Sequence, residues 1–340
     1  MSKHKTRIWI IILIIVFLTL NYIKLPYYLN LPGDAYDLKK IVEVRDGDHA
    51  SGAFMMTTVG VSRSKINIFA YVWSFVAPYH ELIPAENMRR QGESDKEYYY
   101  RQIHMMDMSQ NVAVALAYEK ANKQVNYLYN GVYVMSLIKG MDAANKLKIG
   151  DRIFKVDGKS MKQSEEFIKY VADLLPGDTV TLTLERDGDI LEKEITLNVF
   201  PGEPEKHGVG ISLVTDRKLD VEPEILIDTN KVGGPSAGLM FSLEIYNQLT
   251  EGDLTKGYKI AGTGTINYEG IVGPIGGISQ KIVAADRAGA KYFLAPNENG
   301  VPNSNYRDAL QTVRDINSDM EVIPVDTFED ALTFLNSLNN

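Results

Sequence analysis

The sequence has 340 residues, of which 45% are hydrophobic and 24% charged, and its formal net charge is −8. At roughly 100 to 200 residues per domain, this length predicts about two or three domains. The composition is typical of a globular protein. The acidic balance argues against a nucleic acid as the main partner. Cysteine is absent, which excludes disulfides, thiolate metal sites and a cysteine nucleophile.

The N-terminus combines basic residues with an uncharged apolar segment. Lys3, Lys5 and Arg7 precede a run of mostly apolar residues over 8–23. A bilayer-spanning helix needs about 20 such residues, and no small-residue cleavage site follows. We therefore expect residues 8–23 to be a transmembrane anchor, with a cleaved signal peptide as the alternative. The basic residues predict a cytoplasmic tail over 1–7, with the rest of the chain outside the cell.

Residues 30–122 contain no catalytic pattern. We expect them to form an N-terminal extracytoplasmic region that packs against the rest of the protein. Residues 53–61 are predicted to be a strand, and the apolar segment 66–82 is predicted to contain a buried helix. A second helix is expected from about residue 97 to 121, where apolar residues recur at helical spacing.

Residues 124–198 alternate strands, tight turns and a helix. Asp157-Gly158 and Asp187-Gly188 are typical of hairpin turns, and 164–175 has the pattern of an amphipathic helix that Ser164 would cap. This order, and "LKIGDRIFKVDGKSM" in particular, resembles a bacterial PDZ domain. The resemblance implies that a peptide adds to the sheet as a strand and that a loop holds its carboxylate. That loop position is occupied by Asn130, Gly131, Val132 and Tyr133. A PDZ domain that only packs against its neighbour is the alternative.

Ser236 stands in the pattern G-x-S-x-G, which often exposes a nucleophilic serine at a sharp turn. A serine hydrolase of the α/β type would place its histidine after the serine, but every histidine here precedes Ser236. His207 could serve only in a histidine-first arrangement and lies in a polar linker. Lysine is the other common base for a serine nucleophile. An ordinary role for Ser236 as a helix cap is the structural alternative.

Lys281 is the best candidate for that base. A free lysine has a pKa of about 10.4, which burial can lower by several units. Lys281 lies among Ile278, Ile282 and other apolar residues, in the first turn of a helix that Ser279 is expected to cap and that runs to Arg287. The sequence therefore predicts a neutral lysine near the serine.

"GGPSAG" together with "AGTGTINYEGIVGPIGGISQK" resembles the proteolytic domain of Lon-type proteases. The resemblance implies a Ser–Lys dyad of Ser236 and Lys281, with Thr263 hydrogen-bonded to the lysine, in a domain over 208–340. Ser236 is expected to open a helix running to about Leu249, whose amides stabilise an oxyanion. The residues expected to serve the oxyanion and the substrate backbone are Gly233, Gly234, Ala237 and Gly238. Many Lon proteases have an aspartate where Gly233 stands.

The sequence contains no G-x-x-x-x-G-K-[ST] motif; the nearest approach, Gly252 to Gly257, is followed by Tyr258. Anchor, PDZ and Lon-type domain in that order resemble membrane-anchored PDZ proteases of Gram-positive bacteria. This implies a mixed α/β (α+β) protein acting as an ATP-independent serine endopeptidase on peptides or proteins outside the cell, including a secreted signalling peptide. No metal or cofactor is expected, and an oligomer is left open. The alternatives are a non-enzymatic PDZ scaffold in the envelope and a phosphate-binding domain like that of small-molecule kinases.

Overall fold

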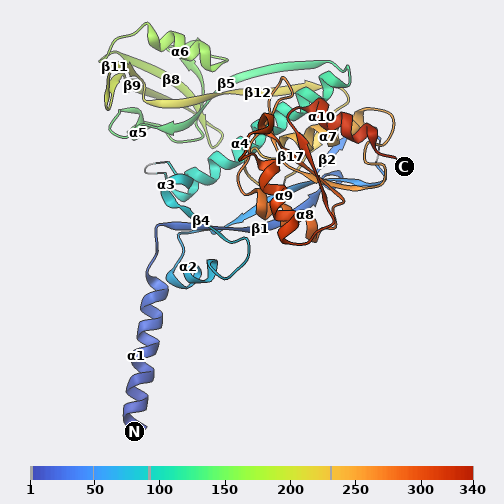
Figure 1. Ribbon diagram of the computed structural model, residues 1–340. Helices are drawn as coiled ribbons and strands as arrows, with labels where there is room; N and C mark the ends of the chain where they lie inside the picture. Colours follow the sequence, from blue (N-terminus) through green and yellow to red (C-terminus); the bar gives the residue numbers. More distant parts are fainter. Residues whose placement is uncertain (1–2, 49, 91–92, 230–231, 340) are drawn as a thin grey trace. The chain divides into compact units, whose positions relative to one another are not determined.

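A computed structural model describes residues 3–48, 50–90, 93–229 and 232–339 (Figure 1). The chain forms two compact units. Unit 1 comprises Met1–Tyr98, Met105–Ala121 and Ile225–Asn340, and unit 2 comprises Tyr99–His104 and Asn122–Glu224. The chain thus leaves unit 1, builds unit 2 and returns, so that unit 1 is assembled from segments far apart in the sequence.

Unit 1 is built on a six-stranded sheet to which both ends of the chain contribute. Four neighbouring strands are parallel, and the last two pair antiparallel. The strand predicted over 53–61 is confirmed, and it pairs with a strand 200 residues later in the chain. The order is β18 (Glu321–Val325), β17 (Tyr292–Pro296), β14 (Lys259–Gly262), β3 (Ala53–Val61), β1 (Tyr27–Asp37) and β4 (Glu81–Pro84). Residues 27–84, expected only to pack against the catalytic region, therefore supply strands of the same sheet.

Helices cover both faces of this sheet because its strands are apolar on both sides. Met55, Ala261 and Phe293 face a core shared with α8 (Ile278–Arg287) and α9 (Asn305–Asp315). On the other face, α7 (Gly238–Leu249) lies so close that a Cβ on Gly262 would meet the Met240 sulfur at 2.5 Å. The helix α10 (Phe328–Ser337) packs near β18. Both α7 and α8 therefore approach the carboxyl end of β14, where ligands bind in many open α/β sheets.

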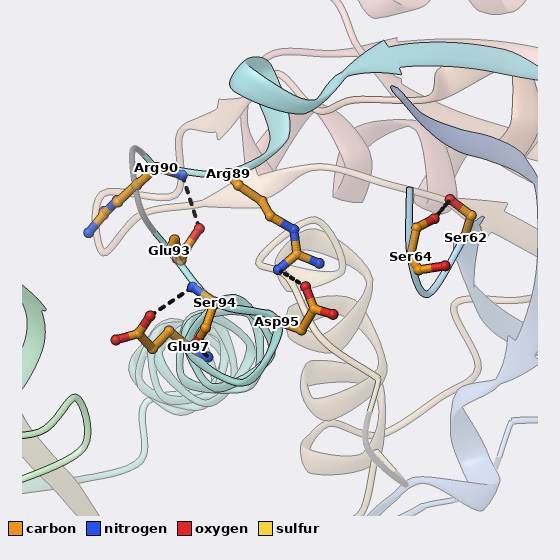
Figure 2. Close-up of polar contacts among 8 residues, drawn as sticks. All are labelled: Ser62, Ser64, Arg89, Arg90, Glu93, Ser94, Asp95 and Glu97. Atoms are coloured by element: carbon orange, nitrogen blue, oxygen red, sulfur yellow. Dashed lines mark hydrogen bonds and ion pairs between the residues drawn. The ribbon is translucent and has the colours of Figure 1, made fainter. Parts of the chain in front are cut away.

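One long helix, whose residues 99–104 belong to unit 2, and several short elements complete unit 1. The helix α4 (Asp95–Lys120) confirms the helix predicted over 97–121. Ser94 and Glu97 form a capping box at its start, and Arg89 pairs with Asp95 (Figure 2). The remaining elements are η1 (Leu38–Lys40), β2 (Val42–Val44), α3 (Ala85–Met88), β13 (Ile225–Ile227), β15 (Thr265–Ile266), β16 (Val272–Gly273) and η2 (Glu298–Gly300).

Unit 2 is a second sheet with two short helices. Its core includes Val132, Ile153, Phe167 and Leu182. The hairpin turns predicted at 157–158 and 187–188 are confirmed by positive φ at all four residues. Ser164 is the first helical residue, so Gln163 and not Ser164 is the cap. The strand order is β12 (Ile211–Val221), β5 (Val125–Leu137), β6 (Arg152–Val156), β8 (Thr179–Arg186) and β9 (Asp189–Thr196), with β7 (Lys159–Ser160), β10 (Asn198–Phe200), β11 (Glu203–Gly208), α5 (Ala143–Lys146) and α6 (Ser164–Ala172) around it.

The boundary between the units differs from the one expected at residue 208. The long strand β12 pairs with β5 along ten residue pairs and belongs to unit 2. The polar linker expected around His207 did not indicate this, because its Pro, Gly and charged residues carry no information about the strand that follows.

Two N-terminal helices expose apolar side chains. Most apolar residues of α1 (Lys3–Tyr22) between Ile8 and Leu18 are exposed. Within the described ranges, however, no helix has both the length and the apolar character required to traverse a bilayer. The helix predicted within 66–82 is present as α2 (Ile68–Ser74). The prediction that it is buried is wrong, because Val72 and Trp73 are about 60% exposed.

Candidate active site

Ser236 lies in a sharp turn immediately before α7. Gly234 has φ of 94°, a conformation that favours glycine, and it turns the chain into Ser236. The helix begins at Gly238 rather than at Ser236, and it ends at Leu249 as predicted. The Ser236 carbonyl accepts hydrogen bonds from the Gly264 N–H at 2.8 Å and from the Thr263 hydroxyl at 2.9 Å. These two hydrogen bonds therefore fix the turn against Thr263 and Gly264, which directly follow β14.

Lys281 projects from α8 onto this turn. Its Nζ lies 2.8 Å from Ser236 Oγ and 2.8 Å from Thr263 Oγ1, and the residue is 3% exposed. The cap of α8 is Gly277, at φ of 70°, and not Ser279 as predicted. Ser279 instead accepts a hydrogen bond from the Thr312 hydroxyl at 2.8 Å. The structure thus brings Ser236, Thr263 and Lys281 together from three separate segments.

Burial lowers the pKa of Lys281 to about 7, because a charged ammonium loses its hydration in this position. A neutral lysine has two N–H groups and one lone pair. One N–H can donate to Thr263, whose own hydroxyl proton goes to the Ser236 carbonyl. The lone pair then faces the Ser236 hydroxyl. This geometry suits transfer of the serine proton to the lysine.

The expected backbone sites around the serine differ from one another. The Gly238 N–H donates to the Pro235 carbonyl at 3.4 Å, whereas the Ala237 N–H has no acceptor among the described residues. Gly233 is exposed and Gly234 buried. A Cβ on Gly238 would meet Ser109 Oγ at 2.8 Å and Ile266 Cγ2 at 2.9 Å. Ala237 therefore offers one donor without an acceptor among the described residues, and Gly238 is needed for close packing.

Two residues that support the site were missed from the sequence. Ser109 on α4 is buried, and its hydroxyl donates to the Pro235 carbonyl at 3.0 Å. Thr57 on β3 donates to the Gly262 carbonyl at 3.1 Å, one residue before Thr263. Both lie in segments without a motif, more than 120 residues before the groups that they hold, so no local signal could have identified them.

The residues predicted to form a carboxylate-binding loop in unit 2 are not in a loop. Asn130, Gly131, Val132 and Tyr133 lie inside β5, and the last two pair with β12 on one side and β6 on the other. Gly131 has φ of 125°, and a Cβ there would meet the Ile153 carbonyl oxygen at 2.4 Å. Glycine is needed at position 131 because a side chain there would collide with β6. The prediction that residues 130–133 form a peptide-binding loop is therefore wrong.

The β5 edge that a peptide would need is filled by β12 of the same chain. Ile211 and Leu213 on β12 pack against the unit 2 core. Thr215 Oγ1 accepts the Ser164 N–H at 3.0 Å at the start of α6. Peptides bind PDZ domains by adding a strand to an open edge. In this structure β12 already makes those main-chain hydrogen bonds.

We therefore expect no measurable binding of short peptides with free carboxyl termini to the β5 edge, with a Kd weaker than about 1 mM. Fluorescence anisotropy with the full chain and an eight-residue apolar peptide measures this. The same peptide with an amidated C-terminus is the matched control. Saturable micromolar binding that is abolished by amidation would show that the peptide displaces β12 from β5.

Comparison with known families agrees with the two units. Residues 227–337 match the C-terminal proteolytic domain of Lon protease (S16), and residues 112–197 match the PDZ domain. The chain thus contains a PDZ domain and a Lon-type domain of the serine peptidase class. The segment that matches the Lon domain, residues 227–337, does not include β1 and β3. Both of these strands nevertheless belong to the same sheet as β14 and β17.

Several Lon proteases are similar over part of their length. The similarity is 29% identity over 167 residues with that of Azospirillum brasilense, covering 49% of this chain and 20% of the relative. It is 40% over 100 residues with that of Campylobacter concisus, covering 29% and 11%. It is 25% over 259 residues with that of Mycoplasma mycoides, covering 72% and 30%. The chain therefore spans less than a third of each of these relatives.

Solved structures similar to this chain include two PDZ domains. That of an SdrC-like protein from Listeria monocytogenes is 37% identical, covering 25% of this chain and 90% of the solved chain, with a TM-score of 0.24. That of an SdrC-like protein from Listeria innocua is 36% identical, covering 24% and 92%, with a TM-score of 0.23.

Proposed function

We propose that this protein is an ATP-independent serine endopeptidase in which Ser236 is the nucleophile and Lys281 the general base. The observation that carries this proposal is the buried Lys281 amine, 2.8 Å from the Ser236 hydroxyl. No Walker motif occurs within these 340 residues, so ATP independence is proposed of this chain alone.

In the proposed reaction, Ser236 Oγ attacks the scissile carbonyl while its proton passes to neutral Lys281. The carbonyl oxygen gains negative charge, and the Ala237 N–H at the start of α7 is the donor best placed to stabilise it. Lys281 then gives its proton to the leaving amine as the C–N bond breaks. In the second half, Lys281 accepts a proton from the water that attacks the acyl-serine ester. It then returns this proton to Ser236 Oγ as the ester C–O bond breaks, which releases the acid and regenerates the Ser236 hydroxyl and the neutral amine.

Thr263 is the positioning residue of this site. Thr263→Val removes both hydrogen bonds of the hydroxyl, while Thr263→Ser retains them. We expect Thr263→Val to lower kcat by about 10- to 1000-fold, by analogy with the loss of one oxyanion donor, and Thr263→Ser to restore most of it. A merely structural role would instead lower the melting temperature of Thr263→Val and leave the kcat of the folded fraction unchanged.

The buried lysine should also reduce the stability of the fold. Its folded pKa of about 7 lies below the ordinary lysine value of 10.5, so the folded state binds fewer protons than the unfolded state between these two pH values. The free energy of unfolding therefore rises with pH between about 7 and 10.5, and the burial penalty is fully present below about 7. At about 1.4 kcal/mol per pH unit this penalty is about 4 kcal/mol at neutral pH.

Lys281→Met removes that penalty together with two hydrogen bonds worth about 1 kcal/mol each. We expect the variant to be more stable than the parent by about 2 kcal/mol at neutral pH, an excess that disappears near about pH 9 and reverses above it. Urea unfolding at two pH values measures this. Equal stability of the two proteins at pH 6 would mean that Lys281 is hydrated in the folded state.

We further propose that the substrates are peptides or proteins outside the cell, and that a secreted signalling peptide is one of them. This rests on the resemblance to membrane-anchored PDZ proteases of Gram-positive bacteria. Membrane attachment through residues 8–23 stays a prediction, for which alkaline extraction of membranes is the test.

The proposed activity is tested by incubating the full chain with unfolded β-casein in the absence of ATP. We expect fragments from the parent protein and none from Ser236→Ala, with the same melting temperature for both. A parent protein that leaves casein and a mixture of short peptides intact would favour the non-enzymatic scaffold. Cleavage that persists in Ser236→Ala would show that the nucleophile lies elsewhere.

A further inference from the structure

A group of large apolar side chains is exposed on α2 and the turn that follows it. Val72, Trp73, Phe75 and Val76 are 60 to 70% exposed, and Phe69 is 38% exposed. We call these five residues the α2 apolar surface. Single exposed apolar residues are common, but a contiguous group of this kind marks a site of interaction with a protein or a membrane.

The structure holds α2 with this surface outward. Asn67 caps the helix by accepting the Ala70 N–H at 2.9 Å, and Ser74 is buried on the inner side. The Tyr71 ring contacts Tyr27 on β1 at a centroid distance of 5.6 Å. The outward direction of Trp73 and its neighbours is therefore imposed by polar and aromatic contacts on the opposite side of the helix.

The α2 apolar surface is continuous with the exposed apolar side chains of α1. The rings of Phe17 and Phe69 lie 4.8 Å apart, and Asn67 donates a hydrogen bond to Asn21 at 2.5 Å. An isolated bridge joins Lys24 to Asn67. Figure 1 shows α2 lying next to the end of α1. Whatever apolar medium surrounds the exposed side chains of α1 near Phe17 therefore reaches α2 as well.

Basic residues border this surface in a chain that is acidic as a whole. Lys24, Arg63 and Lys65 are exposed, and neither 21–33 nor 60–80 contains an acidic residue, although the chain carries a net charge of −8. Ser62 accepts the Leu29 N–H at 3.0 Å and donates to the Ser64 carbonyl at 3.1 Å, which fixes the turn that carries Arg63 (Figure 2). The local charge is complementary to anionic phospholipid headgroups.

We propose that the α2 apolar surface rests in the interfacial layer of an anionic bilayer, with Trp73, Phe75 and Val76 inserted among the acyl chains and Lys24, Arg63 and Lys65 at the headgroups. Tryptophan beside basic residues on a short apolar face is typical of interfacial membrane contacts. The exposed basic residues Lys24, Arg63 and Lys65 favour an anionic lipid surface over a protein partner. The contact requires no helix to cross the bilayer, and it would hold the sheet edge formed by β1 and β4 near the membrane surface.

The test uses the fact that the chain has two tryptophans. In the full chain with Trp9→Phe, Trp73 is the only one. This protein is reconstituted into vesicles of equal parts phosphatidylcholine and phosphatidylglycerol that contain lipids with a nitroxide either near the headgroup or deep in the acyl chain. We expect Trp73 emission to shift to shorter wavelength and to be quenched more by the shallow than by the deep nitroxide, with weak quenching by acrylamide.

Charge and apolar variants complete the experiment. Arg63→Glu with Lys65→Glu should reduce shallow quenching on these vesicles, and high salt should do the same to the parent. Lys291→Glu with Arg314→Glu, the same change of net charge at exposed positions outside this region, should leave it unchanged. Phe75→Ser with Val76→Ser should reduce quenching, whereas Leu226→Ser, on an exposed residue of β13, should not.

Two results overturn the proposal. If acrylamide quenches Trp73 strongly and neither nitroxide does, the side chain lies in water. Trp73 that is shielded from acrylamide and also from both nitroxides is covered by protein, either a second copy or another segment. Neither result depends on the peptidase activity, because α2 carries none of the residues around Ser236.

Discussion

Lys281→Arg is expected to lower kcat/KM for peptide hydrolysis by roughly 10⁴-fold, the scale of losses when a member of a catalytic nucleophile–base unit is removed. Arginine stays protonated at every accessible pH and cannot accept the Ser236 proton. The Ser236 hydroxyl would then keep its proton, and only substrate binding and the oxyanion donor would remain. Cleavage of a fluorogenic peptide at pH 8 measures the effect.

Because arginine places a permanent charge in a buried position, a loss of activity could also come from unfolding. Lys281→Met separates the two causes, since it fits an apolar environment and is expected to raise stability. Both variants should be inactive, and Lys281→Met should remain fully folded by circular dichroism. A tenfold difference in rate corresponds to a barrier difference of only about 1.4 kcal/mol. If the folded Lys281→Met protein hydrolyses the peptide at a rate within about tenfold of that of the parent, Lys281 is not the base.

The second large effect is that of pH. With the pKa of Lys281 at about 7, the amine is charged below that pH and cannot accept a proton. We expect kcat/KM to fall about tenfold per pH unit on the acid side, which makes it about 100-fold lower at pH 5 than on the plateau above pH 8. Rates measured from pH 5 to 9 test the midpoint, and a midpoint above pH 9 would show that the lysine is hydrated in the free enzyme.

Glu244 on α7 is a second group that titrates in the same range. Burial raises its pKa to about 7, and Gln248 donates a hydrogen bond to its carboxyl group. Glu244 lies on the helix that begins next to Ser236, so its ionisation could mimic that of the base. Glu244→Gln removes this titration while keeping the hydrogen-bonding shape. The midpoint of the pH profile should stay near 7 in this variant, because Lys281 is unchanged.

The dyad could be predicted from the sequence because its chemistry is local. Ser236 sits in a glycine-rich turn, and Lys281 sits in an apolar helix after Gly276 and Gly277. Once histidine and cysteine were excluded, a lysine in an apolar setting was the remaining base. The structure places these two residues within hydrogen-bonding distance, although their catalytic roles stay proposals.

The parts that sequence reasoning missed all depend on long-range pairing. The strand β3 was recognised, but nothing in its apolar run says that it pairs with β14. The position of Ser109 behind Pro235 depends on how α4 packs. In unit 2, the PDZ resemblance placed Asn130 to Tyr133 in a loop, whereas these residues lie in β5 and Gly131 relieves crowding within that strand. The apolar segment around α2 suggested burial, because composition alone cannot tell a core from an exposed apolar surface.

The central claim, that a neutral Lys281 activates Ser236, is tested most directly by labelling with a serine-directed fluorophosphonate followed by peptide mapping. In the full-length protein at pH 8 we predict covalent label on Ser236, a labelling rate that falls as the pH drops below about 7, and loss of the label in folded Lys281→Met. Equal labelling of Ser236 in the parent and in folded Lys281→Met, or label on a different serine in the parent, would contradict the account.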